Sequence, residues 1–309
     1  MSAIPAPGRS IDLDRLLQGS QLPALPQSAI RLLELSKDAK NGPADYAGPI
    51  EADPGLAAQV LKFVNSSYFG LAREVLSVKH AISLVGVRTI KNFVLWTAVF
   101  SLMPNPKSGP IDLKALRQDS LRRGLFARGM ARRLGVKDAE DLFSAALLQD
   151  MAIPILAKAL PNEYAELAQQ RRERGVPLSE LERERFGWDH AEAAGRLVTA
   201  WNMPASFATL ISLHTKLDEV GARPTITPEE AAVLLSSLLP SVLETQWRPQ
   251  DRFDDLFRRA AESRGVTVLE VLQETDREMA DFSAILHLDA PAEPLAARYQ
   301  AALEPAVQA

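Results

Sequence analysis

The chain has 309 residues, of which 47% are hydrophobic and 24% charged, so its composition is that of a globular protein with room for about two domains. The formal net charge of −4 argues against a general nucleic-acid binder, although a local basic face stays open. The absence of cysteine excludes disulfides, thiol nucleophiles and cysteine-based metal sites, and it fits a reducing cytoplasm.

The N-terminal residues are small or proline, and we expect a flexible leader over residues 1–15. From there on, apolar residues recur at spacings of three and four, the period of a helix, and no run alternates with a period of two. The sequence therefore predicts an all-α fold. The most apolar stretch, Phe93 to Met103, is about half the length that crosses a bilayer, so we expect no membrane insertion and a cytoplasmic location.

Several helix starts can be read from capping residues. Asp53 precedes a proline at a first helical position, and Thr227 is followed by Glu230 in the spacing of a capping box. Ser77 is expected to cap a helix that Gly86 interrupts. The second half of this helix–glycine–helix unit is too apolar for a DNA-reading helix, so we expect it to be buried and expect no nucleic-acid partner.

The segment 104–112 holds three prolines and a glycine between two helical regions, and it predicts a linker. We therefore divide the chain into an N-terminal helical lobe of residues 16–103 and a second lobe of residues 113–290. A helical tail over residues 291–309 follows.

Basic residues gather in the first helix of the second lobe. We interpret them mainly as a solvated face, partly neutralised by the acidic residues at 138, 140 and 141; a binding face for an acidic or phosphorylated partner is the alternative. The residues are Arg117, Arg122, Arg123, Arg128, Arg132 and Arg133.

Four motifs occur in order along the chain: LPALP at 22–26, IEADPGL at 50–56, NSSYFG at 65–70 and AISLVG at 81–86. With them the chain resembles the HDOD family, the HD-related output domain of bacterial signalling proteins, over residues 16 to 287. The resemblance implies an N-terminal helical bundle packed on a C-terminal lobe related to the HD fold.

A further stretch, residues 145–152, is similar to the His-Asp centre of the wider HD phosphohydrolase superfamily. Gln149 stands where that superfamily has its histidine, and Asp150 follows it. The superfamily's first histidine falls near Asp119, while His190 and His214 lie in segments that resemble its later histidine-bearing ones.

An HD-type hydrolase uses its metal to generate a nucleophile from water. A glutamine amide is a weak ligand for such a metal, so the changes at Gln149 and Asp119 remove two ligand nitrogens. The remaining residues could together hold one metal: Asp119, Asp150, His190 and His214. We nevertheless expect neither a metal nor another cofactor, and no catalysis.

The resemblance thus predicts a non-enzymatic output or adaptor protein in bacterial signal transduction, which binds other signalling proteins. The alternatives are a degenerate metal-dependent phosphohydrolase and a sensor that binds a small nucleotide in the old cleft. A corner at a helix end before Gly70 is either structural or a place of interaction, and it consists of Asn65, Ser66, Ser67 and Tyr68.

Overall fold

The computed structural model describes residues 11–19, 25–38, 40–102, 111–261, 264–286, 288–289 and 291–303. Over these residues the chain consists of helices and contains no strand, which confirms the predicted all-α fold. The first ten residues of the predicted leader, most of the predicted linker, residues 22–24 of the first motif and residues 304–309 of the tail lie outside the described residues.

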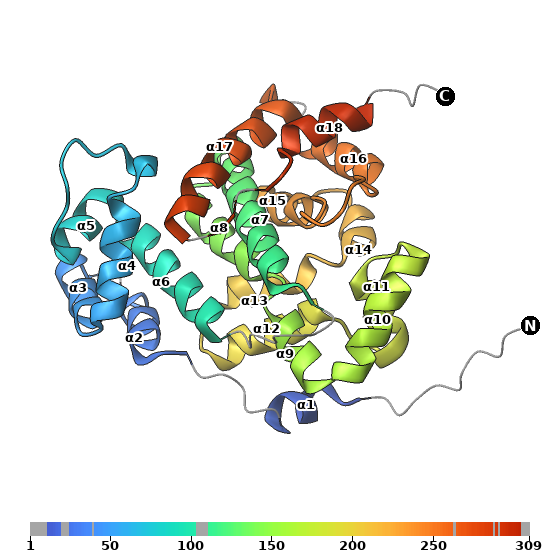
Figure 1. The fold of residues 1–309 in the computed structure, drawn as a ribbon, viewed down its shortest axis with the longest axis horizontal. Coiled ribbons are helices and arrows are strands. Elements are labelled where there is room, and N and C mark those ends of the chain that lie inside the picture. Colours follow the sequence, from blue (N-terminus) through green and yellow to red (C-terminus); the bar gives the residue numbers. More distant parts are fainter. Residues whose placement is uncertain are drawn as a thin grey trace, which may run out of the picture.

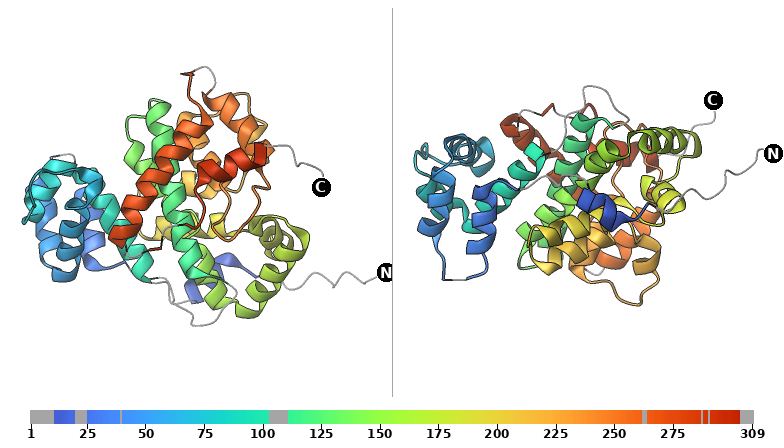
Figure 2. Two further views of the ribbon diagram at one scale, coloured as in Figure 1. Left: turned by 45° about the horizontal axis from the view of Figure 1, so that its top comes forward. Right: turned by 90° about the horizontal axis from the view of Figure 1, so that it is seen from below.

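The first third of the chain forms short helices. Their bounds are α1 (Leu13–Gly19), α2 (Gln27–Leu35), α3 (Pro43–Glu51), α4 (Pro54–Val64), the 3₁₀ helix η1 (Ser67–Phe69), α5 (Val78–Val85) and α6 (Val87–Leu102). In the ribbon views, α2–α5 form a group at one end of the molecule, and α6 leads from this group into the remainder (Figures 1 and 2).

The remainder is built around one long helix, α7, with α8, α15 and α17 packed against it (Figure 1). The bounds are α7 (Leu113–Arg133), α8 (Ala139–Leu148), α9 (Ala152–Ala159), α10 (Pro161–Arg174), α11 (Leu178–Phe186), α12 (His190–Ala200), α13 (Ala205–Leu213), α14 (Leu217–Gly221), α15 (Pro228–Ser237), α16 (Gln250–Ala261), α17 (Val268–Leu286) and α18 (Leu295–Leu303). The predicted linker falls between the end of α6 and the start of α7, mostly outside the described residues, so the linker and the lobe boundaries stay a prediction.

The predicted capping residues do what their chemistry suggests. The Asp53 carboxylate accepts the backbone N–H of Leu56, and Thr227 forms a complete capping box with Glu230. Gly86, at φ +93°, ends α5, and the next helix departs at 116° to it. A left-handed backbone of this kind favours glycine, so the interruption predicted there is confirmed.

Helix α1 packs on the second lobe rather than beside α2. The Trp188 indole N–H donates to the Ile11 carbonyl oxygen at 2.6 Å, and Arg196 forms an ion pair with Asp14. Leu13 is 3% exposed. The predicted leader of residues 1–15 therefore ends in a docked helix.

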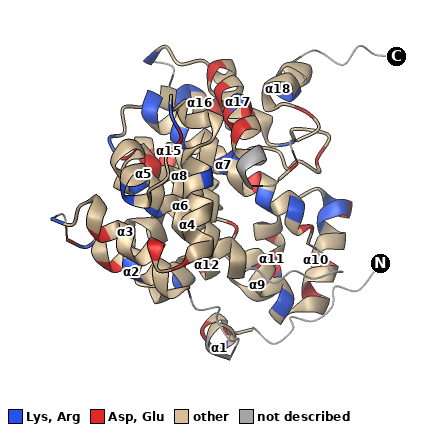
Figure 3. Cartoon of the chain, turned by 60° about the vertical axis from the view of Figure 1, so that its left-hand side comes forward, with Lys and Arg blue, Asp and Glu red and all other residues tan. Residues whose placement is uncertain are grey.

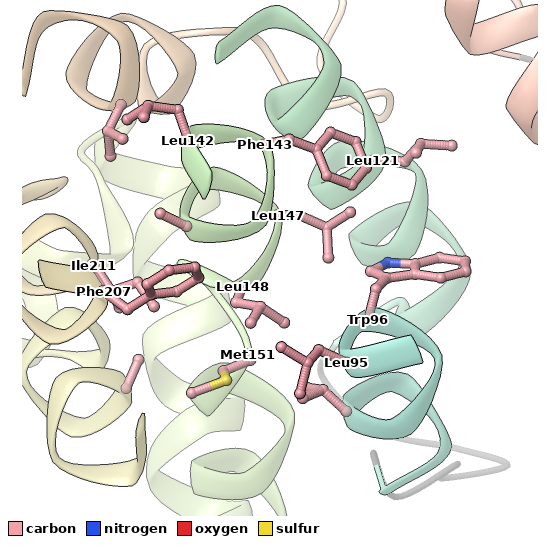
Figure 4. Packing of buried hydrophobic residues seen from close by; sticks show 14 of the residues in the cluster. Leu95, Trp96, Leu121, Leu142, Phe143, Leu147, Leu148, Met151, Phe207 and Ile211 are labelled. Atoms are coloured by element: carbon pink, nitrogen blue, oxygen red, sulfur yellow. The ribbon is translucent and has the colours of Figure 1, made fainter. Parts of the chain in front are cut away.

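The core between the lobes is apolar. In the close view, Trp96 of α6 lies beside Leu147 of α8, and Leu95 lies near Leu148 and Met151 (Figure 4); all of these side chains are buried. The α8–α9 segment Ala139–Ala159 is long and apolar enough to span a membrane, with a mean hydropathy of 1.4, but 78% of it is buried inside the protein. Core helices of soluble proteins have this composition too.

The arginines of α7 do not form the solvated face that we predicted from the sequence. Arg122 is 2% exposed and Arg128 1%, because α8, α15 and α17 surround the helix on several sides. In the view of Figure 3, acidic and basic positions are interspersed over the helices that the structure describes.

Candidate functional site

Three of the predicted positions come together in the second lobe. Asp150 lies in the turn between α8 and α9, His190 opens α12, and His214 follows α13. The ligand atoms of these side chains all lie within 4.8 Å of one another, and all three residues are buried. Among the described residues this is the one cluster of its kind.

The three ligand atoms form a nearly regular triangle. Asp150 Oδ1 is 3.3 Å from His190 Nε2 and 3.4 Å from His214 Nε2, and the two Nε2 atoms are 3.2 Å apart. The centre of such a triangle lies about 1.9 Å from each corner, since that distance is the side divided by √3. Bonds from zinc to histidine nitrogen measure about 2.0–2.1 Å. One metal ion therefore fits the spacing.

The hydrogen bonds of the two histidines fix which nitrogen carries the proton. His190 Nδ1 is 2.6 Å from Glu182 Oε2, and His214 Nδ1 is 2.6 Å from the carbonyl oxygen of Ile211. A carboxylate and a carbonyl only accept, so each Nδ1 must donate. In the neutral rings both Nε2 atoms then present lone pairs to each other and to Asp150. Three acceptors that converge in this way favour a cation between them.

The surroundings keep this arrangement in place. The Tyr164 hydroxyl donates to Glu182 Oε1 at 2.6 Å, and Glu182 also accepts the backbone N–H of His190. Burial raises the pKa of Tyr164 well above its ordinary value, so the hydroxyl stays protonated. Burial, followed by the neighbouring His190, lowers the pKa of His214 to about 3, which favours the neutral ring. This pairing of histidine with a carboxylate is typical of metal ligands.

The start of α12 is held by Asp189, the residue before His190. Its carboxylate caps the helix by accepting the N–H of Glu192, and it accepts the Thr215 hydroxyl at 2.7 Å. Because Thr215 follows His214, this one side chain fixes both histidine-bearing segments relative to each other.

Asp119 does not belong to the cluster. Its carboxylate accepts the Ser241 hydroxyl at 2.5 Å and the backbone N–H of Val242 at 2.8 Å. It therefore fastens the loop after α15 to α7. Including Asp119 among the residues that could hold a metal was wrong.

Gln149 also turns away from the cluster. It is fully buried, and its Oε1 lies 3.4 Å from the hydroxyl oxygen of Ser236 on α15, whose proton is donated to the Val233 carbonyl at 2.6 Å. Its Nε2 has no hydrogen-bond partner among the described residues. Neither of the two positions where the HD superfamily would supply further histidines thus adds a ligand.

Two residues of the site escaped sequence reasoning. Glu182 orients His190 from α11, and Arg123 of α7 forms an ion pair with Asp150 Oδ2. Both residues are separated in sequence from the side chains that they contact, and Arg123 is one of the arginines that we predicted to be solvated. Its side chain is 15% exposed, and burial lowers its pKa while Asp119 opposes that change.

The four residues of the predicted corner make contacts within the molecule. The Asn65 amide both donates to and accepts from the backbone of Val75 at 2.7 Å, and Ser66 donates to the Phe63 carbonyl. Ser67 and Tyr68 reach α17, where they donate to Asp281 at 3.2 Å and Glu278 at 3.4 Å. The corner thus joins the two lobes.

Comparison with known proteins bears on the family. The HDOD domain model matches residues 22–217, which is more than half of the chain. The chain belongs to the HDOD family. An uncharacterized protein of Treponema pallidum (strain Nichols) is 27% identical over 218 residues, or 69% of this chain, and the chain spans 40% of the length of that relative.

Solved structures share the HDOD fold. An HDOD domain protein of unknown function from Geobacter sulfurreducens superimposes with a TM-score of 0.70 at 19% identity, over 90% of this chain and 97% of its own. A proposed phosphohydrolase from Shewanella amazonensis SB2B superimposes with a TM-score of 0.62 at 18% identity, over 93% of each chain. A proposed signal transduction protein from Marinobacter aquaeolei VT8 superimposes with a TM-score of 0.66 at 20% identity, over 88% of this chain and 61% of its own. Family membership supports a role in signalling.

Proposed function

We propose that this HDOD protein is a non-enzymatic output or adaptor module of bacterial signal transduction that acts by binding other signalling proteins in the cytoplasm. The observation that carries the proposal is the state of the two altered positions. Gln149 is turned toward Ser236 of α15, and Asp119 is hydrogen-bonded to the loop after α15, so neither joins the cluster as a metal ligand.

The chemistry of the remaining donors points the same way. A metal held by Asp150, His190 and His214 would supply Lewis acidity and lower the pKa of a bound water. The residues of this chain that would assist are already committed: Arg123 pairs with Asp150, and Glu182 with His190. Asp189, a further carboxylate beside the two histidines, is likewise engaged by Arg183, by Thr215 and by the cap of α12.

The proposal is tested by assaying the full chain with Mn²⁺, Fe²⁺ or Ni²⁺ against bis-p-nitrophenyl phosphate, nucleotides and cyclic dinucleotides. We expect rates no higher than those of the Asp150→Asn variant, which removes the anionic ligand. Metal-dependent turnover that Asp150→Asn abolishes would contradict the proposal.

The binding half of the proposal needs a separate measurement. We expect a crosslinking experiment in the native cell to capture the same signalling protein with the wild type and with Asp150→Asn, because binding through a helical surface does not use the buried cluster. Loss of capture in a folded Asp150→Asn protein would instead link the partner to the cluster.

A metal-dependent phosphohydrolase, or a nucleotide sensor, is the second candidate. The convergence of three acceptor atoms on one point favours it. A nucleotide that binds the folded state must raise its melting temperature, so a thermal-shift series with nucleotides separates the sensor from the adaptor.

A further inference from the structure

Arg123 is the feature of the cluster that neither the family resemblance nor the metal spacing explains. It lies on α7, one turn after Asp119, and its guanidinium is paired with Asp150 Oδ2 while Oδ1 faces both histidines. The side chains are 15% and 5% exposed, so water screens this ion pair little. Asp150 therefore already has one positive partner before any metal is considered.

The charges within the cluster can be counted. Asp150 and Glu182 each carry −1, Arg123 carries +1, and the imidazoles and Tyr164 are neutral, which leaves a net charge of −1. The next carboxylates outward each have an arginine that balances their charge. Asp189 pairs with Arg183, and Asp119 lies beside the buried Arg122.

One added positive charge balances this cluster, whereas two overfill it. A divalent ion would leave a net +1 in a buried site, close to the guanidinium of Arg123. Like charges repel strongly where water is excluded. The spacing admits a metal, but the charge disfavours a divalent one.

We infer that Arg123 keeps a divalent metal out of the Asp150–His190–His214 cluster, by supplying to Asp150 the positive charge that a metal would otherwise supply. Without Arg123 the cluster becomes a divalent-metal site. This deepens the proposed function, because a residue that excludes divalent metal also removes the cofactor on which catalysis would depend.

The test measures Mn²⁺ binding to the full chain by calorimetry, and by the loss of the free Mn²⁺ signal in electron paramagnetic resonance. Arg123→Met removes the charge at similar length, and its thioether is a poor ligand for this metal. We expect Arg123→Met to bind one Mn²⁺ at least about tenfold more tightly than the wild type. Arg123→Lys keeps the charge and should stay close to the wild type.

Controls separate charge from misfolding. Arg123→Gln serves if Arg123→Met fails to fold, since its amide can still donate to Asp150 without a charge. The double variant Arg123→Met, Asp150→Asn loses both charges and should fold without gaining Mn²⁺ affinity. Thermal melts report whether each variant is folded.

The inference is overturned if the wild type binds Mn²⁺ as tightly as Arg123→Met, if Arg123→Lys gains the same affinity, or if no folded neutral variant binds Mn²⁺. These outcomes differ from failure of the proposed function, which shows as turnover rather than affinity. A wild type that binds Mn²⁺ tightly but hydrolyses nothing would refute the role of Arg123 alone.

Discussion

Two consecutive residues at the end of α8 have opposite surroundings. Asp150 faces Arg123 and the two histidines, while the side chain of Gln149 points to Ser236 on α15. The resemblance predicted which residues to examine, and Asp150, His190 and His214 do converge. It could not predict Arg123 or Glu182, because their partners are set by how α7 packs on α8 and how α11 turns into α12.

The buried amide of Gln149 provides a test at this scale. Its Nε2 has no partner among the described residues, and an unpaired buried donor costs about 1–3 kcal/mol. We expect Gln149→Met, which is similar in volume and apolar, to raise the free energy of unfolding by about 1 kcal/mol in urea denaturation.

A matched control lies on α7. Gln118 is also buried, but its Nε2 donates to the Asp289 carbonyl at 2.5 Å. Gln118→Met should therefore lower the free energy of unfolding by about 1 kcal/mol. If both variants lose stability equally, the Gln149 amide has a partner.

At the scale of elements, α7 organises the second lobe. It carries Asp119, Arg123 and Arg128, and it is buried over most of its length. Helical periodicity predicted α7, but the sequence of one segment does not show how many faces of its helix other helices cover. An arginine in such a helix is buried when its partners come from α8 and α17, and this is why the solvated face was a wrong interpretation.

The contact between α7 and α8 depends on Gly124, the residue after Arg123. A methyl group at Gly124 would lie 3.0 Å from the Phe143 carbonyl oxygen and 3.1 Å from Leu147 Cβ, both on α8. Alanine gains about 0.5–1 kcal/mol in helix propensity, yet overpacking against a rigid helix costs about 1–3 kcal/mol. We expect Gly124→Ala to lower the free energy of unfolding, measured by urea denaturation.

Gly129 on the same helix is the control. A methyl group there meets its nearest neighbours at 3.7–3.9 Å, an ordinary contact distance. Gly129→Ala should therefore raise the free energy of unfolding by about 0.5–1 kcal/mol. Equal effects of the two variants would mean that α7 and α8 can separate without cost.

At the scale of the whole molecule, the two lobes meet around Arg128. Its guanidinium lies 3.0 Å from Glu278 of α17 and 3.6 Å from Glu140 of α8. It also lies over the rings of Tyr68, Phe143 and Phe282, at 5.0–5.4 Å from their centroids. The family motif at residues 65–70 thus contributes Tyr68 to the lobe junction.

A small cavity of about 10 Å³ adjoins this junction, between rings of both lobes and the side chains of Arg128 and Glu140. Trp96 and Arg128 line it, and Trp96 Nε1 and Arg128 Nε have no hydrogen-bond partner among the described residues. The sequence predicted two helical regions and the corner between helices. The contact that joins them could not be predicted, because α17 follows the corner by about two hundred residues.

The last prediction concerns Arg128 at this lobe junction. Arg128→Met leaves the carboxylates of Glu278 and Glu140 without their buried partner, at 12% and 20% exposure, and removes the cation from three rings. Breaking a buried pair from one side costs about 3–5 kcal/mol. We expect that loss in the free energy of unfolding.

Arg132 is the control. It pairs with Glu140 at 3.0 Å and lies 3.9 Å from Glu278, but it is 45% exposed, so Arg132→Met should cost less than about 1 kcal/mol. Urea denaturation measures the loss of stability in both variants. A larger loss for Arg128→Met means that the buried guanidinium stabilises the lobe junction, whereas equal losses would mean that apolar contacts alone stabilise it.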